Sequence, residues 1–249
     1  MHLSDDDRSG NRKGKGLIWA LGDLHLDYKK EKPMDVFGKD WEDHEERIFD
    51  AWKERVRPED IVLLVGDISW ALKLEEGEKD LRRLETLPGT KICIKGNHDY
   101  WWSSLKKMYD LGLSDMEFLQ NTGYVAAGIG ICGSRGWSDI DSGGFDEKDE
   151  KIYLRELNRL RLSIEDMEAK GKEAGLTKRI AMLHYPPFSA KGSPNDFADI
   201  LKEAGIDICV YGHLHSYGHK FIVEGDIEGV EYICVSSDYI DFRPVQIEV

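Results

Sequence analysis

Residues 91–99 have the sequence KICIKGNHD, in which a short apolar run stops at Gly96 and Asn97, His98 and Asp99 follow at once. Other short apolar runs end in the same abrupt way, at residues 16–21, 61–65, 179–184 and 207–211. Continuous apolar runs of this length are typical of strands that are buried on both faces. Because the carboxyl ends of such strands meet at one edge of an α/β sheet, the polar residues that follow them are predicted to converge.

Helical patterns of apolar residues alternate with these runs, at residues 41–56, 72–87, 146–174 and 195–204. Toward the C-terminus, residues 220–224, 231–235 and 245–248 are predicted to be strands in hairpin connection. This order of elements predicts an α/β (α+β) fold, a layered sandwich with mixed sheets. Residues 1–16 are polar and glycine-rich and are predicted to form a disordered tail, whereas residues 17–249 are predicted to form a single domain.

The composition is that of a folded, acidic protein, with 34 Lys and Arg against 48 Asp and Glu and a net charge of −14. This balance argues against a general nucleic-acid groove and against a polybasic membrane surface. The longest uncharged apolar run, residues 124–134, is much shorter than the roughly 20 residues of a membrane helix. The four dispersed cysteines are expected to be buried free thiols in a reducing compartment, which favours the cytoplasm.

Asp, Asn and His side chains make up the polar clusters at the ends of the runs. Seven of them are candidate metal ligands: Asp23, His25, Asp67, Asn97, His184, His213 and His215. A mixture of imidazole and oxygen ligands suits Mn, Fe, Zn or Co. Seven ligands exceed the needs of one ion and can serve two if one carboxylate bridges them, which is the arrangement used for displacement at phosphorus.

The ordered motifs D-x-H, GD, GNHD, a lone His and GHxH, between Asp23 and His215, resemble the signature of the calcineurin-like metallophosphoesterases, of the bacterial predicted-phosphohydrolase type. The resemblance implies a four-layer α/β/β/α sandwich with a dinuclear metal centre, Mn being favoured over Fe, Zn and Co. It implies that Asp67 bridges the ions, with His98 as the catalytic histidine beside a metal-activated water. One ion would be held by Asp23, His25 and His215, and the other by Asn97, His184 and His213.

One departure from the superfamily concerns the GD motif, which continues as GDxxDRG in the Ser/Thr protein phosphatases. Here Trp70 and Ala71 stand where that pattern has Asp and Arg. A protein-phosphatase function is therefore disfavoured. The departure also leaves open which group orients His98, and the neighbouring Asp99 is one candidate.

Two further features predict substrate contacts. Tyr100 and Trp101 follow the GNHD turn and could stack on a substrate, although core packing is the alternative. Arg135 could bind a phosphate oxygen, although a loop salt bridge is the alternative. His2, His44 and His219 lie outside the motifs and are interpreted as surface residues.

The predicted function is hydrolysis of a phosphomonoester or phosphodiester of a small molecule, with nucleotides among the candidates. A nuclease and a phosphoprotein phosphatase are alternative enzymes. A non-catalytic metal-binding interaction module is an alternative of a different class, as is a single structural metal. The expected partner is a small phosphate ester, neither a membrane nor nucleic acid is expected, and the oligomeric state is left open.

Overall fold

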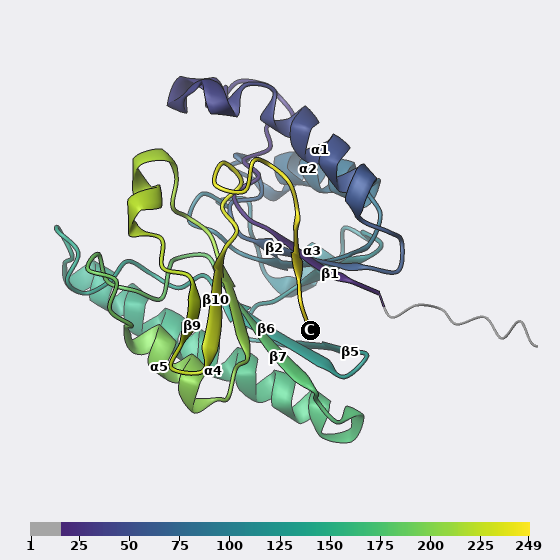
Figure 1. The fold of residues 1–249 in the computed structure, drawn as a ribbon. Coiled ribbons are helices and arrows are strands. Elements are labelled where there is room, and N and C mark those ends of the chain that lie inside the picture. Colours follow the sequence, from purple (N-terminus) through teal and green to yellow (C-terminus); the bar gives the residue numbers. More distant parts are fainter. Residues whose placement is uncertain (1–15) are drawn as a thin grey trace, which may run out of the picture.

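The computed structural model describes residues 16–249, so the predicted tail lies outside the described residues apart from Gly16. Within this part of the chain, two mixed sheets face each other and helices cover the outer face of each (Figure 1). The arrangement is the four-layer α/β/β/α sandwich, and the predicted fold class is confirmed.

The first sheet has the strand order β11-β1-β2-β3-β4. Its members are β1 (Ile18–Leu21), β2 (Ile61–Val65), β3 (Thr90–Ile94), β4 (Met116–Phe118) and β11 (Val245–Ile247). Strands β1 to β4 run parallel, whereas β11 runs antiparallel to β1. The parallel strands β1, β2 and β3 therefore end at one edge of this sheet, where the first three motifs follow.

The second sheet has the order β5-β6-β7-β8-β10-β9. Its members are β5 (Tyr124–Ala126), β6 (Ile129–Ser134), β7 (Lys178–Leu183), β8 (Ile208–Tyr211), β9 (Gly225–Ile227) and β10 (Val230–Cys234). Strands β6, β7, β8 and β10 are parallel, and the edge strands β5 and β9 are antiparallel to their neighbours. The carboxyl ends of β7 and β8 carry the remaining motifs.

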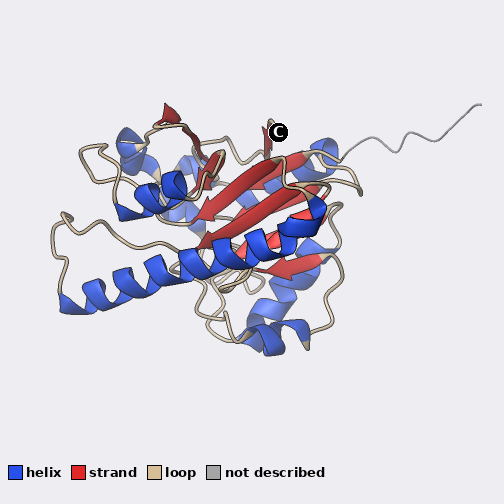
Figure 2. Cartoon of the chain, turned by 90° about the horizontal axis from the view of Figure 1, so that it is seen from below, coloured by secondary structure: helices blue, strands red, loops and turns tan. Residues whose placement is uncertain are grey.

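Helices α1 (His44–Arg55), α2 (Leu74–Glu85) and α3 (Leu105–Tyr109) pack on the first sheet, and α4 (Glu147–Ala174) and α5 (Asp196–Glu203) pack on the second (Figure 2). Side-chain caps fix the starts of the last two. Asp146 accepts hydrogen bonds from the amides of Lys148 and Asp149 in a capping box, and Asn195 accepts one from Phe197. The bounds of the four predicted helices, which correspond to α1, α2, α4 and α5, agree with the structure within about three residues.

Three apolar layers hold the sandwich together. One lies between the first sheet and its helices, one between the second sheet and its helices, and the third between the two sheets. The middle layer contains Ile92 and Ile94 of β3 opposite Ile131 of β6 and Met182 of β7, all fully buried. Because both sheets pack on this layer, the edges that carry the motifs are held together.

The strand predicted at residues 220–224 is wrong. Residues Ser216–Phe221 form a 3₁₀ helix, η3, and the strand is β9, which forms a hairpin with β10. The hydroxyl of Tyr211 donates to the carbonyl of Val223 and accepts from its amide, at 2.8 and 2.9 Å. The Tyr211 side chain thus occupies the amide and the carbonyl of Val223, which a strand at this position would need for pairing with a neighbouring strand. The last strand, β11, joins the other sheet rather than a hairpin.

The four cysteines, Cys93, Cys132, Cys209 and Cys234, are buried free thiols, as predicted. Burial raises the pKa of the Cys132 and Cys234 thiols to about 12, so both are protonated and unreactive at neutral pH. Among residues 16–249, no helix combines the length and the apolar character that crossing a bilayer requires.

Candidate metal centre

The structure brings all seven predicted ligands to one edge of the sandwich. Asp23 follows β1, Asp67 follows β2 and Asn97 follows β3 in the first sheet. His184 follows β7 directly, and His213 and His215 follow β8 in the second sheet. The ligands are thus contributed by two layers whose relative position is set by the apolar contact between them.

The backbone at four of these residues is left-handed, a conformation that non-glycine residues seldom adopt. The φ angles are 58° at Asp23, 46° at His25, 49° at Asp67 and 74° at His213. Such conformations cost on the order of 1 kcal/mol or more each and cluster at functional sites. Hydrogen bonds between the loops hold the conformation, since the amides of Asp23 and His25 donate to the carbonyls of Gly66 and Asp67.

Two glycines let the loops approach each other more closely than a side chain would permit. A Cβ on Gly96 would lie 2.1 Å from the amide nitrogen and Oδ1 of Asp67. A Cβ on Gly212 would lie 2.5 Å from Oδ2 of Asp23. Both distances are shorter than real Cβ contacts, so glycine is required at these two positions for the carboxylates of Asp67 and Asp23 to lie where they do.

One group of potential ligands comprises Asp23, His25 and His215, whose ligand atoms lie within 4.8 Å of one another. His215 Nε2 lies 3.3 Å from Asp23 Oδ1. Its Nδ1 pairs with Asp238 Oδ1 at 2.7 Å, which fixes the ring. This group is the triad that the resemblance assigns to one ion. Asp238 is a residue that the motif analysis missed.

A second group comprises Asp23, Asp67 and His184, again with ligand atoms within 4.8 Å. His184 Nδ1 donates to the carbonyl of Val65 at 3.0 Å, which leaves a lone pair on Nε2 in the neutral ring. That Nε2 lies 2.7 Å from Asn97 Oδ1 and 3.4 Å from Asp67 Oδ2. Acceptor atoms that converge in this way are stabilised by a cation between them.

Asp67 Oδ2 also lies 3.9 Å from His25 Nε2, so this oxygen sits between the two groups. The remaining predicted ligand, His213, is held by its backbone, whose amide donates to Asp23 Oδ2 at 3.0 Å. Its ring centroid lies 5.1 Å from that of His184 and 4.0 Å from that of Tyr185. The division of the ligands between two ions stays a prediction.

Two buried polar atoms in the centre lack a hydrogen-bond partner among the described residues: Asp23 Oδ1, whose ion-pair neighbour is His215 Nε2, and His25 Nδ1. An unsatisfied buried oxygen or nitrogen costs about 1–3 kcal/mol. Carboxylate oxygens and neutral imidazole nitrogens are donors that first-row metal ions accept. The residues present therefore fit metal ions, and the buried Asp and His groups are ones that could bind them.

The electrostatics of the centre make three of its imidazoles neutral, whereas neighbouring carboxylates keep His215 protonated. Burial lowers the pKa of His25, His184 and His213, the last to about 3, so their rings are neutral at pH 7. Burial and the charge of Asp23 raise the pKa of Asp67 well above its usual range. Burial alone would lower the pKa of His215, but Asp23 and Asp238 raise it to about 10.

His98 lies at the mouth of the centre, and its amide donates to Asp67 Oδ1 at 2.7 Å. Among the described residues its ring is positioned by packing rather than by a hydrogen bond. Trp70 lies 4.4 Å from the His98 ring at 52°, and stacks on His25 at 4.7 Å and 22°. Trp70 therefore contacts two imidazoles at once, a role that its position in the altered GD motif could have suggested.

Asp99 does not orient His98. Its Oδ1 accepts from the amides of Ile68 and Ser69 and from Trp101 Nε1, and its Oδ2 accepts from the amide of Gly96. The bonds from Ile68 and Ser69 tie the GD loop to the GNHD loop, and the other two hold the GNHD loop itself. The carboxylate is fully buried, and burial raises its pKa to about 6. Asp99 is thus a support for the loops that carry Asp67 and Asn97.

A cleft of about 300 Å³ opens over the centre and is lined by His25, Asp67, His98, His213 and His215. Trp41, Trp70 and Met34 supply its apolar wall. His44, interpreted as a surface residue, is 8% exposed, because it packs against Trp41. His219 is half-buried near Asp238, whereas His2 lies outside the described residues.

The predicted substrate contacts have different surroundings. Trp101 is 1% exposed in the core and contacts Gly77 of α2, so the alternative of core packing is the one that the structure shows. Tyr100 is 61% exposed beside His98, at a ring distance of 6.4 Å. Arg135 pairs with Glu156 of α4 at 3.3 Å and lines a second cavity rather than the cleft.

Comparison with known proteins gives similarities to two phage proteins, to solved structures and to one family. Gene 66 proteins of Mycobacterium phages D29 and L5 are 34% and 32% identical over 84 and 81 residues. These matches cover 33% and 32% of this chain and only 40% and 39% of the phage proteins. The chain thus spans about two fifths of the length of these curated relatives.

Among solved structures, TT1561 of Thermus thermophilus superposes with a TM-score of 0.52 and 12% identity, over 81% of this chain and 83% of that one. The protein of unknown function AQ665 from Aquifex aeolicus gives 0.48 and 17%, over 93% and 95%. The first of these likenesses shows the fold alone. Residues 16–217 match the calcineurin-like phosphoesterases, and the chain belongs to this family.

Proposed function

We propose that the protein is a dinuclear metal-dependent phosphoesterase that hydrolyses a phosphomonoester or phosphodiester of a small molecule. The observation that carries the proposal is the convergence of buried Asp and His side chains on two groups that share Asp23, whose Oδ1 is buried without a hydrogen-bond partner among the described residues. Family membership adds to it. All seven ligand positions and His98 are present, which disfavours a module that has lost catalysis.

The roles of the residues follow from their positions. Metal ions would supply Lewis acidity and a water of lowered pKa. One ion would be held by Asp23, His25 and His215 and the other by Asn97, His184 and His213, and Asp67 would contribute to both. His98, at the mouth of the cleft, would stabilise charge on the phosphoryl oxygens and give a proton to the leaving oxygen.

The size of the cleft and the charge of the protein favour a small substrate. A cleft of about 300 Å³ is at the low end of the range for small-molecule sites. The net charge of −14 repels a long polyanion such as RNA or DNA. Manganese is our preferred metal, with iron, zinc and cobalt as alternatives, and the buried free thiols favour a cytoplasmic location.

The test is hydrolysis of p-nitrophenyl phosphate and bis-(p-nitrophenyl) phosphate by protein that is stripped with a chelator and reloaded with Mn, Fe, Zn or Co. We expect metal-dependent turnover that falls at least about 100-fold in His98→Ala. Asp67→Asn should lower both turnover and the number of bound ions. Asp50→Asn, on the exposed face of α1, is the matched control and should behave as the wild type.

Each outcome has a definite meaning. The preferred ester decides between a monoesterase and a diesterase. Turnover that survives in both site variants would overturn the assigned roles. Two bound ions per chain without turnover by any metal would favour the non-catalytic interaction module, whereas one tightly held ion would favour a structural site.

A further inference from the structure

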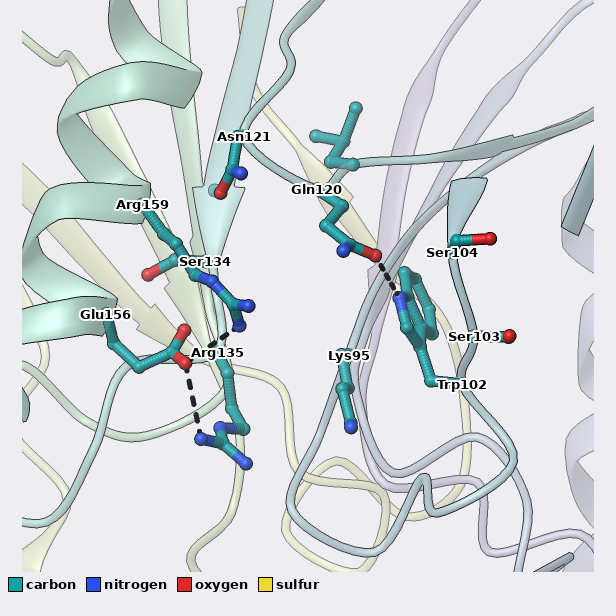
Figure 3. Close-up of a pocket in the computed structure, with 12 residues that line it drawn as sticks. Lys95, Trp102, Ser103, Ser104, Gln120, Asn121, Ser134, Arg135, Glu156 and Arg159 are labelled. Carbon is teal, nitrogen blue, oxygen red and sulfur yellow. Dashed lines mark hydrogen bonds and ion pairs between the residues drawn. The ribbon is translucent and has the colours of Figure 1, made fainter. Parts of the chain in front are cut away.

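A second cavity, of about 330 Å³, lies beside the metal-ligand cluster and is drawn in Figure 3. One wall carries Arg135, which directly follows β6, and Glu156 and Arg159 of α4. The opposite wall carries Lys95, which directly follows β3, and Trp102. We call this space the cationic cavity.

The cationic charge of the cavity exceeds what its one carboxylate can neutralise. Arg135 and Arg159 both pair with the same oxygen of Glu156, Oε1, at 3.3 and 3.0 Å. Arg155 approaches that oxygen as well, at 3.6 Å. Glu156 is 1% exposed and is the only acidic residue among the described residues that line the cavity. Three lining cations therefore face one carboxylate, an excess of two positive charges.

Lys95 forms neither an ion pair nor a side-chain hydrogen bond within the described part of the chain, although it is only partly exposed. Arg135 Nε is also buried without a hydrogen-bond partner among these residues. Burial and the charges of Arg135 and Arg159 lower the pKa of Lys95. A salt-bridge network with a purely internal role would pair all of its cations, whereas here the Lys95 ammonium and Arg135 Nε have no partner among the described residues.

The uncharged groups of the cavity suit a polar ligand. Trp102 presents an aromatic surface and is fixed by a hydrogen bond from its Nε1 to Gln120 Oε1 at 2.9 Å (Figure 3). In Figure 3 the side chain of Arg159 extends from α4 toward the space between the walls, and that of Lys95 lies along the opposite wall. A tetrahedral oxyanion with two charges matches such a set of donors, because guanidinium groups and an ammonium bind its oxygens.

The cavity adjoins the metal-ligand cluster. Lys95 lies two residues before Asn97. The carbonyl of Arg135 accepts from the amide of Tyr185, whose ring lies 4.0 Å from that of His213. A ligand with two phosphates could therefore engage both sites at once.

We propose that the cationic cavity is a binding site for a phosphate group of a small molecule, distinct from the ester that the metal-ligand cluster would hydrolyse. Lys95, Arg135 and Arg159 donate to its oxygens, and Glu156 holds the two guanidinium groups in place. If the proposed function holds, a substrate with a second phosphate group would be bound here by that group. The cavity itself binds phosphate whether or not the protein is an esterase.

The test is calorimetric titration of the full chain with inorganic phosphate in the presence of a chelator, at low ionic strength. We expect binding that weakens about 10-fold or more in Lys95→Gln and in Arg159→Gln, because each loses a charge-assisted contact. Lys95→Arg should retain the affinity. Arg161→Gln, an exposed position on the same helix as Arg159, is the matched control and should not change it.

Two results would overturn the proposal. The first is the absence of phosphate binding, or equal binding by Lys95→Gln and the wild type, with thermal melts showing that both are folded. The second is loss of binding in His98→Ala with Lys95→Gln unaffected, which would place the phosphate at the metal-ligand cluster. Since the titration involves no hydrolysis, its failure is distinguishable from failure of the esterase assay.

Discussion

Replacement of Trp70 by alanine tests whether stacking positions the two imidazoles at the centre. Trp70 packs on His25 at 4.7 Å and on His98 at 4.4 Å. An aromatic pair contributes about 0.5–1.5 kcal/mol beyond the area that it buries. Two such pairs give about 1–3 kcal/mol, which corresponds to a loss of about 5- to 150-fold in kcat/KM.

The assay is hydrolysis of the preferred p-nitrophenyl ester at saturating metal, with the number of bound ions measured on the same samples. Trp70→Phe retains an aromatic face but loses the hydrogen bond from Nε1 to Met34 Sδ, so it should recover most of the activity. Leu72→Ala, in the same loop and 58% exposed, is the control. Activity of Trp70→Ala within twofold of the wild type would refute the reasoning. A phenylalanine variant as poor as the alanine variant would assign the effect to the Met34 contact.

Three further substitutions follow from the structure. Asp99→Ala leaves four hydrogen-bond donors without an acceptor. At about 1 kcal/mol for each donor, the free energy of unfolding measured by urea denaturation should fall by about 4 kcal/mol. A loss below about 1 kcal/mol would contradict the role of Asp99. Gly96→Ala should abolish binding of at least one ion, as measured by metal content, because its Cβ would overlap Asp67; full occupancy would show that the loops can separate. Burial lowers the pKa of Lys91 in the folded protein. Between this lowered pKa and the unfolded value of about 10.4, the unfolded chain binds more protons than the folded one. The contribution of Lys91 to the free energy of unfolding should therefore rise with pH in this window. Lys91→Met should remove this rise and stabilise the protein at pH 7, and urea denaturation at pH 7 and 10 checks both; an unchanged slope would exclude Lys91 as its source.

The strands that carry the motifs could be predicted from sequence because their apolar runs are continuous and stop abruptly, at glycine in every case except the run before His184. The observed β2 has the predicted bounds, and β3 and β7 differ from prediction by about one residue. The short strands β4 and β5 were not predicted, since three residues hold too little periodicity. Their position depends on pairing with β3 and β6, which is a tertiary effect.

The residues of the centre could be predicted as a set, but their supports could not. Asp238 has no motif of its own and reaches His215 only because β10 pairs with β8. Asp238 does lie shortly after the strand-like run at residues 231–235, two residues beyond Ser236. The search for polar residues at the ends of apolar runs, which identified the ligands, could therefore have been extended to it. The direction in which Asp99 points is set by the amides of another loop, which no local pattern records.

The contact between Asp23 and the amide of His213 has a consequence for how the protein acquires its activity. The two residues are 190 positions apart in the chain. Contacts of such long sequence separation form late, because a large loss of chain entropy precedes them. During synthesis, the ligands of the first sheet therefore cannot form the complete site until residue 215 has been synthesised and the two sheets have packed together. Recovery of metal binding during refolding should accordingly lag behind the recovery of helix, and it would report completion of the whole sandwich.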